Sequence, residues 1–136
     1  TQSRSSAASD VYKRQHVLQT LAGLLKEHAR ATDLVARWGG EEFLVLLPDT
    51  SLAGAQQMGE QLRLAVRGSP FRWQQTDVPI TVSIGAATWS SGPFRANALV
   101  ASADGALYQA KTSGRNRVCV ADNHTPLPAG DKVAAI

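Results

Sequence analysis

Two adjacent carboxylates, Glu41 and Glu42, follow two adjacent glycines, Gly39 and Gly40, near the first third of the chain. Carboxylate oxygens are ligands that Mg²⁺ prefers, and glycine lets a metal or phosphate approach the backbone closely. Residues in this order therefore suit a metal or phosphate site. Gly-Gly turns are common, however, and glutamates beside them are more often only solvated, so the four residues alone leave both interpretations open.

The stretches on either side of these residues are apolar and predict the two arms of a β-hairpin. The first arm covers 34–36 and the second covers 42–47. Apolar runs joined through Gly-Gly are typical of a hairpin, because glycine adopts the positive φ angles of a tight turn. The hairpin would place both carboxylates at its tip, where a ligand can reach them.

Two basic residues, Lys111 and Arg115, lie at the end of a predicted helix over 96–113. An ammonium is a point charge and a guanidinium is a bidentate fork, and both bind phosphate oxygens. Basic residues near a helix C-terminus can also complement the helix dipole without binding a ligand. Taken alone, the pair does not distinguish a phosphate site from an ordinary helix end.

Both segments resemble the GGDEF family of diguanylate cyclases, which condense two GTP into cyclic di-GMP. Residues 34–48 resemble the family's catalytic motif with its flanks. Residues 103–117 resemble its "AD-x-ALY-x-AK-x-x-GRN" signature at nearly every fixed position. Two separate matches in one chain make family membership the leading interpretation.

The resemblance implies a role for each charged residue of the two motifs. Glu41 would bind Mg²⁺ (or Mn²⁺) and help to deprotonate the 3′-hydroxyl of GTP, and Glu42 would be a second acid. Lys111 and Arg115 would hold the phosphates, while the glycine pair would let GTP lie against the backbone. Such a site needs little covalent chemistry from the protein, since phosphoryl transfer depends mainly on placed charges.

A third segment, Arg30-Ala31-Thr32-Asp33, resembles the family's product-inhibition site, RxxD, which binds a cyclic di-GMP dimer. By that resemblance Arg30 pairs with phosphate and stacks on guanine, and Asp33 accepts hydrogen bonds from a guanine edge. Arg/Asp pairs at helix ends are also common on surfaces, but the spacing to the glycine pair favours the inhibitory site. Arg63, on the next predicted helix, is a candidate for a contact from a neighbouring subunit.

Hydrophobic periodicity predicts the elements that position these motifs. Besides the hairpin, we expect helices over 16–30, 52–66 and 96–113, a short edge strand over 71–73, and strands over 78–88 and 117–120. Thr50 or Ser51 should cap the second helix, and Gly114 should follow the third. The order predicts an α+β fold with an antiparallel-rich central sheet flanked by helices. The resemblance implies a ferredoxin-like palm of the nucleotidyl-cyclase type, lacking its first strand.

The N-terminal residues 1–15 are rich in Ser, Arg and Ala and show no helical or strand period. Residues 10–15 resemble the translated end of a transposon adapter used to build sequencing libraries, which predicts a non-native segment. A genuine disordered N-terminus is the alternative. The expected organisation is therefore a non-native segment over 1–15, a partial GGDEF domain over 16–120 and a C-terminal tail over 121–136.

The resemblance begins only at His16, so part of the family's domain has no counterpart. In the family, a first strand supplies an aspartate that binds both metals, and the next segment reads the guanine base. The family pattern would place another aspartate where this chain has Gln15. The first strand is central in the family's sheet, and a sheet without it exposes unpaired backbone groups. We therefore expect this chain to be poorly folded alone and to make no cyclic di-GMP.

Two functions follow from these expectations. The first is a diguanylate cyclase, product-inhibited through RxxD, of which this chain is an inactive fragment; the intact domain would act as a homodimer with one GTP per subunit. The alternative is a catalytically silent module that binds cyclic di-GMP through Arg30 and Asp33. The presence of Glu41, Lys111 and Arg115 argues against the second, since a pure sensor would not need them.

Length, net charge and composition narrow the class of protein further. The 136 residues suggest one domain, and a net charge of +3 is too small to indicate a nucleic-acid surface. The single cysteine is compatible with a reducing compartment, and no apolar run approaches the ~20 residues of a membrane span. We expect a cytoplasmic domain that binds GTP and cyclic di-GMP but no nucleic acid. Any membrane anchor would lie in a missing N-terminal region.

Overall fold

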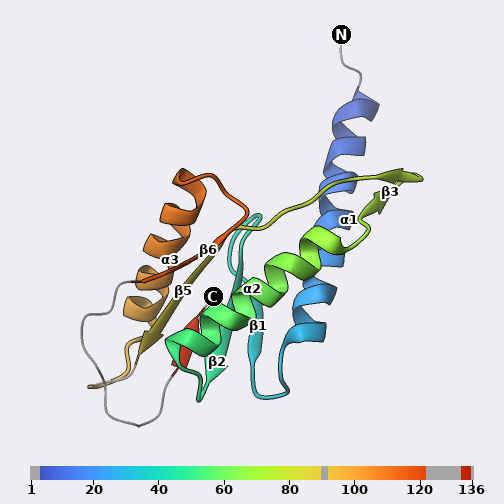
Figure 1. Ribbon diagram of the computed structural model, residues 1–136. Coiled ribbons are helices and arrows are strands. Elements are labelled where there is room, and N and C mark those ends of the chain that lie inside the picture. The colour runs from blue at the N-terminus through green and yellow to red at the C-terminus, as the bar shows by residue number, and fades with distance from the viewer. Residues whose placement is uncertain (1–3, 90–91, 122–132, 136) are drawn as a thin grey trace.

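The computed structural model describes residues 4–89, 92–121 and 133–135 (Figure 1). A mixed sheet carries helices on both faces, beside a small two-stranded ribbon. The elements in chain order are α1 (Arg4–His28), β1 (Leu34–Arg37), β2 (Phe43–Pro48), α2 (Leu52–Gly68), β3 (Arg72–Trp73), β4 (Thr76–Asp77), β5 (Ile84–Trp89), α3 (Ala96–Thr112), β6 (Val118–Val120) and β7 (Val133–Ala135). This is the predicted α+β class.

The hairpin that carries the acidic turn forms as predicted. β1 and β2 pair antiparallel, with Arg37 opposite Phe43 as the last pair before the loop. Across the loop, the Trp38 amide donates to the Glu42 carbonyl over 2.9 Å. The turn is therefore closed by backbone groups, and both carboxylates lie at the hairpin tip.

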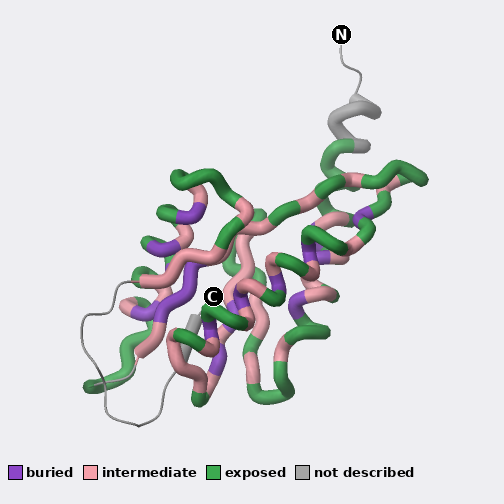
Figure 2. Tube along the Cα trace, in the orientation of Figure 1, coloured by how far each residue is buried: buried purple, intermediate pink, exposed green. Residues whose placement is uncertain are grey.

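The core has two parts, one on each face of the sheet, and Figure 2 marks the buried residues along the chain. On one face, Val45 and Leu47 of β2 are buried with Leu62 of α2 and with apolar side chains of α1. On the other face, Ala87 of β5 packs against Leu99 of α3. Successive residues of a strand point to opposite faces, so β2 and β5 each contribute to both layers.

Helix α1 begins at Arg4 and so includes residues 4–15, although this segment shows no helical period; the helix predicted over 16–30 is thus longer at its start and ends at His28. Buried Leu18, Leu21 and Leu25 follow at helical spacing and face the core. Once these turns form, a helix extends through polar residues at little cost, which a search for periodicity does not register. An adapter origin for the segment stays a prediction. Across the described ranges, α1 and the other helices are too short or too polar to span a membrane.

The ends of the two later helices follow local sequence chemistry. Ser51 is the N-cap of α2, and its hydroxyl accepts a hydrogen bond from the Gly54 amide over 3.1 Å. Gly114 follows α3 with a φ of 126°, a value that favours glycine. Both cap predictions are confirmed.

The predicted edge strand near Phe71 belongs to a separate ribbon instead of the main sheet. β3 and β4 pair with each other through a turn at Gln74 and Gln75, whose φ angles are 49° and 66°. Two positive φ angles are those of a two-residue type I′ hairpin. Phe71 itself is only 1% exposed and anchors the ribbon to the core.

The β-rich segment predicted over 78–88 forms a strand only in its second half. β5 begins at Ile84, and the preceding residues are irregular although Val78, Ile80 and Val82 still pack against the core. Alternating apolar residues thus reach the core, but within the described part of the chain the backbone of 78–83 pairs with no partner strand. A strand needs such a partner, which the local pattern does not guarantee.

The main sheet has the order β1-β2-β7-β5-β6, so the C-terminal strand lies at its centre. Ala134 of β7 stands opposite Leu47 of β2 and opposite Thr88 of β5, antiparallel to both. The prediction of a tail over 121–136 is therefore wrong for 133–135, and 122–132 lie outside the described residues. A strand at this position pairs backbone groups that β2 and β5 would otherwise leave open.

Candidate active site

Glu41 and Glu42 stand at the hairpin tip, but their side chains have different partners. Arg14 of α1 donates from Nε to the Glu41 carboxylate over 3.1 Å. Lys111 of α3 donates from Nζ to the Glu42 carboxylate over 3.3 Å. Glu41 is 63% exposed and Glu42 is 41% exposed. The acidic turn therefore bridges two helices, and Glu41 is the more accessible carboxylate.

The glycine pair is held by Arg37, which donates to the Gly39 carbonyl over 3.4 Å and to the Gly40 carbonyl over 2.6 Å. The expectation of positive φ angles at this pair is wrong, since the described glycines with such angles are Gly92 and Gly114. The loop from 38 to 42 is longer than a two-residue turn and closes without left-handed residues. A Cβ at Gly40 would meet nothing within 4 Å, so this backbone is open to a ligand.

The end of α3 presents Lys111 and Arg115 toward the same region. The Arg115 amide donates to the Ala110 carbonyl over 2.9 Å, the bond that closes a Schellman motif around Gly114. This turn reverses the chain directly after the helix. Lys111 therefore projects from the helix and Arg115 from the loop behind it, on one side of the hairpin tip.

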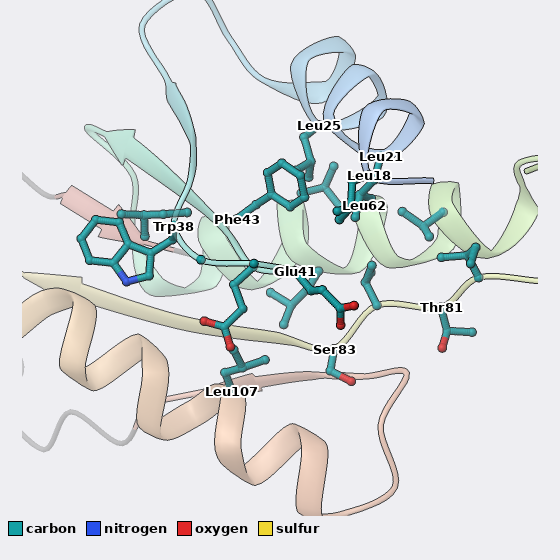
Figure 3. A pocket seen from close by; sticks show the side chains of 18 of the residues that line it. Leu18, Leu21, Leu25, Trp38, Glu41, Phe43, Leu62, Thr81, Ser83 and Leu107 are labelled. Carbon is teal, nitrogen blue, oxygen red and sulfur yellow. The ribbon is translucent and has the colours of Figure 1, made fainter. Parts of the chain in front are cut away.

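A cavity of about 930 Å³ joins these parts (Figure 3). Its lining includes the four charged residues predicted for the site, namely Glu41, Glu42, Lys111 and Arg115. Leu21, Phe43 and Leu62 form an apolar wall on one side, and Leu107 of α3 lies on the other. The cavity is thus polar where the hairpin meets α3, and apolar toward α2 and the leucines of α1, while Asp10, Lys13 and Arg14 add charged groups from the first half of α1.

The apolar part of this cavity lies beside the parts of β2 and β5 that do not pair with β7. β7 pairs with residues 46–48 of β2 and with residues 87–89 of β5. Both neighbours run past it, and the lining of the cavity includes Phe43, Leu44 and Val45 of β2 and Ile84 and Gly85 of β5. Among the described residues, β7 pairs with the ends of β2 and β5 farther from the acidic turn, and the cavity lies beside the other ends.

Three residues of the site had no assigned role in the sequence. Arg37 lies in the flank of the first motif, and Asp104 lies in the second motif and lines the cavity. Arg37 and Asp104 could have been found from the sequence, because both lie inside the two motifs. Arg14 lay in the segment attributed to an adapter, and only the tertiary structure places it on Glu41.

The residues around the cavity do not form a ready metal centre. Across the described ranges, no three side chains of His, Cys, Asp or Glu gather as possible ligands. Mg²⁺ that arrives with a nucleotide needs only one or two carboxylates besides phosphate oxygens and water. Glu41 fits that lesser requirement, because its exposed carboxylate has one solvent-accessible partner, Arg14.

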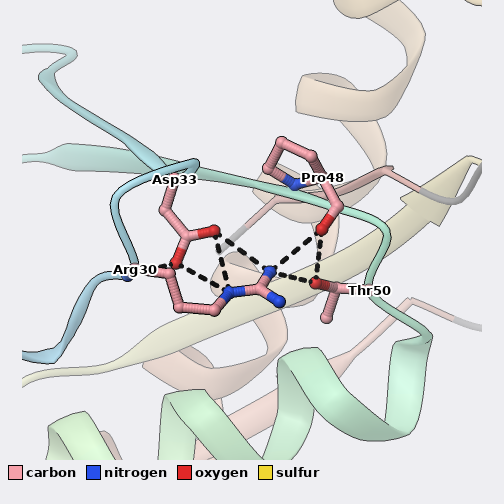
Figure 4. Close-up of polar contacts among 4 residues, drawn as sticks. All are labelled: Arg30, Asp33, Pro48 and Thr50. Carbon is pink, nitrogen blue, oxygen red and sulfur yellow. Dashed lines mark hydrogen bonds and ion pairs between the residues drawn. The ribbon is translucent and has the colours of Figure 1, made fainter.

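Arg30 and Asp33 form a compact cluster at the opposite end of the hairpin (Figure 4). Asp33 accepts the Arg30 amide over 2.7 Å, and its side chain is fully buried. The Arg30 Nη2 donates to Asp33, to the Pro48 carbonyl over 2.9 Å and to the Thr50 hydroxyl over 2.7 Å. The four residues of β1 separate this cluster from the acidic turn by about 13 Å. The RxxD residues thus lie together, apart from the cavity.

The fold and this geometry define a class of protein. An α+β sheet carries an acidic turn that faces a lysine and an arginine across a cavity, which is suitable chemistry for a phosphorylated ligand. The chain belongs to the GGDEF family: the family described as "Diguanylate cyclase, GGDEF domain" matches residues 14–117.

Curated relatives agree with this assignment. The chain is 36% identical over 120 residues to diguanylate cyclase A of Treponema denticola, covering 88% of this chain and 31% of the relative. It is 44% identical over 105 residues to diguanylate cyclase DgcP of Pseudomonas aeruginosa, covering 77% of this chain and 16% of the relative. The chain therefore spans less than a third of the length of either relative.

Solved structures support the same fold. The GGDEF domain of DgcB from Caulobacter crescentus, solved with c-di-GMP, matches with a TM-score of 0.73 and 31% identity, over 79% of this chain and 64% of that one. The active GGEEF domain of a diguanylate cyclase from Vibrio cholerae matches with a TM-score of 0.68 and 29% identity, over 80% and 69%. The predicted family and fold are confirmed.

Proposed function

We propose that the protein to which this chain belongs condenses two GTP molecules into cyclic di-GMP and releases pyrophosphate. The observation that carries the proposal is the meeting of the acidic turn with Lys111 and Arg115 at one cavity. Glu42 and Lys111 are 69 positions apart in the chain, yet their side chains are in contact. Family membership and the relatives named diguanylate cyclase support the same reaction.

In this proposal Lys111 and Arg115 hold the triphosphate. Lys111 must first leave Glu42, a partly exposed pair of the kind worth about 0.2–1 kcal/mol. Hydrogen bonds to a charged phosphate are worth roughly 1.5–3 kcal/mol, so the exchange favours the nucleotide. The open backbone at Gly40 leaves room for the phosphates and ribose beside these cations, and a Cβ at Gly39 would meet only the Glu42 side chain, at 3.9 Å.

The reaction joins the 3′-oxygen of one GTP to the α-phosphorus of the other. As that bond forms, the bond from the α-phosphorus to pyrophosphate breaks, and Glu41 accepts the proton of the 3′-hydroxyl. Glu42 is the second acid of the turn. Mg²⁺ or Mn²⁺, when bound with the nucleotide, would neutralise charge on the phosphates. Each ring closure needs two such sites, so the working form is a homodimer with one GTP per subunit.

This chain by itself would be inactive. Arg14 contacts Glu41, and the next residue is Gln15, where the family pattern would place an aspartate. Arg14 also opposes a cation at that carboxylate, since both compete for the same oxygens. Purified chain incubated with GTP and Mg²⁺ should yield no cyclic di-GMP by liquid chromatography and mass spectrometry. Accumulation of product with time and enzyme concentration would contradict this.

Nucleotide binding tests the site independently of turnover. Lys111→Ala should weaken GTP binding by at least about tenfold, because a charge-assisted phosphate contact is lost. Lys26→Ala is the matched control, since Lys26 is an exposed lysine at the end of α1, away from the cavity. Titration calorimetry with GTP measures both. Equal affinities for the two variants would overturn the assignment of Lys111.

A catalytically silent module that binds cyclic di-GMP is the second candidate. The cluster of Arg30 and Asp33 favours it, because that cluster is already assembled while Glu41 contacts Arg14. In either case the cluster would bind product, and in the cyclase it would inhibit the enzyme. A protein with the complete domain separates the two: Glu41→Ala should abolish synthesis but spare cyclic di-GMP binding. Absence of synthesis before that change would favour the silent module.

A further inference from the structure

The loop after α3 presents Arg115 from an unusual backbone conformation. Arg115 has a φ of 61° and Asn116 a φ of 46°. Left-handed angles are rare for residues with a side chain, apart from asparagine and aspartate, and the arginine side chain makes no local hydrogen bond that favours them. Two consecutive residues of this kind persist only where surrounding contacts determine them. The contacts that hold this loop therefore fix the backbone of Arg115, and with it the position from which its side chain extends.

Among the contacts that hold the loop from outside the helix, three involve Arg115 or Asn116. The Asn116 amide donates to the Ser83 hydroxyl over 3.2 Å, just before β5. The Arg117 Nε donates to the Arg115 carbonyl over 3.1 Å. On the third side, Arg63 of α2 donates from Nη1 to the Asn116 side-chain oxygen over 3.1 Å. Asn116 is thus tied to the sheet through its backbone and to α2 through its side chain.

Arg63 is itself fixed in place. Its Nε and Nη2 both donate to the Glu60 carboxylate one turn earlier on α2, and the Arg63 side chain is only 14% exposed. The hydrogen bond to Arg63 lowers the pKa of the Glu60 carboxyl, and the same pair raises the pKa of Arg63. The guanidinium therefore stays charged and oriented, and its third nitrogen is aimed at Asn116.

We propose that Arg63 is a positioning residue for nucleotide binding, which holds Arg115 at the cavity by fixing Asn116. The proposal rests on the proposed GTP site, in which Arg115 touches phosphate and Arg63 does not. It gives Arg63 a role inside its own subunit, different from the contact to a neighbouring subunit expected from the sequence.

The geometry requires arginine in particular. One edge of the guanidinium binds Glu60 while the remaining nitrogen reaches Asn116, so three donors act in one plane. A lysine has one nitrogen and cannot satisfy both partners in this fixed arrangement. Arg63→Lys should therefore keep the charge but lose most of the positioning effect.

A double-mutant cycle on the full chain tests the proposal. Arg63→Ala should weaken GTP binding about three- to tenfold, the loss expected for one hydrogen bond. In a chain that already carries Arg115→Ala, Arg63→Ala should cause no further loss, since it acts only through Arg115. Arg67→Ala, at an exposed arginine one turn further along α2, is the matched control and should leave affinity unchanged.

Hydrogen exchange provides a readout that does not depend on the nucleotide. The Asn116 amide, bonded to Ser83, should exchange faster in Arg63→Ala than in Arg67→Ala, while amides in the core of β5 should not change. Asn116→Gly removes the side-chain oxygen but permits the left-handed backbone, so it should weaken GTP binding as Arg63→Ala does.

The outcomes separate this proposal from the one on which it rests. If the unchanged chain does not bind GTP, the proposed GTP site is wrong. If the Asn116 amide exchanges at the same rate in Arg63→Ala as in the unchanged chain, Arg63 does not fix Asn116, and the positioning role is wrong whether or not GTP binds. If GTP binds, equal additional losses from Arg63→Ala with and without Arg115 would show a general structural effect and overturn the proposal. Faster exchange together with a non-additive cycle supports it.

Discussion

At the scale of residues, the role of each charged side chain in this chain depends on the residue it contacts. Glu41 and Glu42 are neighbours in sequence, yet one contacts α1 and the other α3. Glu60 and Arg63 lie one helical turn apart, and their pair supports a loop that follows a different helix. An ion pair of this kind matters chiefly because it orients a donor, since partly exposed pairs contribute little stability by themselves.

The ion pair of Glu60 and Arg63 makes the stability of the folded chain depend on pH. Arg63 lowers the pKa of Glu60 from its ordinary value of 4.5, so the pair stabilises the folded chain above that value. The contribution is lost as pH falls through the lower, folded-state pKa, where the carboxyl becomes protonated. Unmodified chain should therefore have a higher melting temperature than Glu60→Gln at pH 7, and the difference should vanish at strongly acidic pH. Circular dichroism melts at both pH values measure this, and a gap that grows on acidification would contradict it.

At the scale of elements, the site depends on how closely α3 approaches the sheet. A Cβ at Gly85 would lie 2.2 Å from the Ala103 carbonyl oxygen and 2.2 Å from the Leu107 nitrogen, both backbone atoms of α3. No side-chain rearrangement can relieve such a contact. Glycine at this position lets α3 pack directly on β5, and α3 in turn carries Lys111 to the hairpin tip.

We expect Gly85→Ala to destabilise the chain by about 1–3 kcal/mol or more, the cost of forcing extra atoms into a packed interior. Shifting α3 should also separate Lys111 from Glu42. Gly105→Ala is the matched control on α3, because a Cβ there meets nothing within 4 Å. That change should stabilise the helix by roughly 0.5–1 kcal/mol. Urea unfolding of both variants tests the pair of predictions, and similar unfolding midpoints would count against this packing argument.

At the scale of the whole molecule, the sheet is continuous only because its last strand lies at its centre. β7 joins β2 to β5, and so connects the hairpin that carries the acidic turn with the strand beneath α3. The cavity occupies the rest of that central space. The two halves of the candidate site are therefore held in register by three residues near the end of the chain.

Ala134→Pro tests this arrangement. Proline has no backbone N–H, and Ala134 lies between Leu47 of β2 and Thr88 of β5. Loss of one ladder bond at the sheet centre should lower the free energy of unfolding by at least about 1 kcal/mol. Ala134→Ser keeps the N–H and serves as the control. If both variants unfold at the same urea concentration, β7 does not hold the sheet together.

Much of the fold and most of the candidate site could be predicted where the signal is local. Apolar runs around Gly39 and Gly40 predicted the hairpin, and the caps at Ser51 and Gly114 followed from side-chain chemistry and backbone freedom. The two motifs named the charged residues that line the cavity. These predictions hold because each depends on residues within a few positions of one another.

The sequence by itself therefore determined the hairpin, the helix ends, the family and the residue types of the site. Tertiary structure decided that β7 lies between β2 and β5, that β5 starts only at Ile84, and that Lys111 contacts Glu42. Strand pairing and ion pairing across the fold depend on which distant backbone or charge arrives alongside. No periodicity within a short window contains that information, because the partners come from segments far apart in the chain.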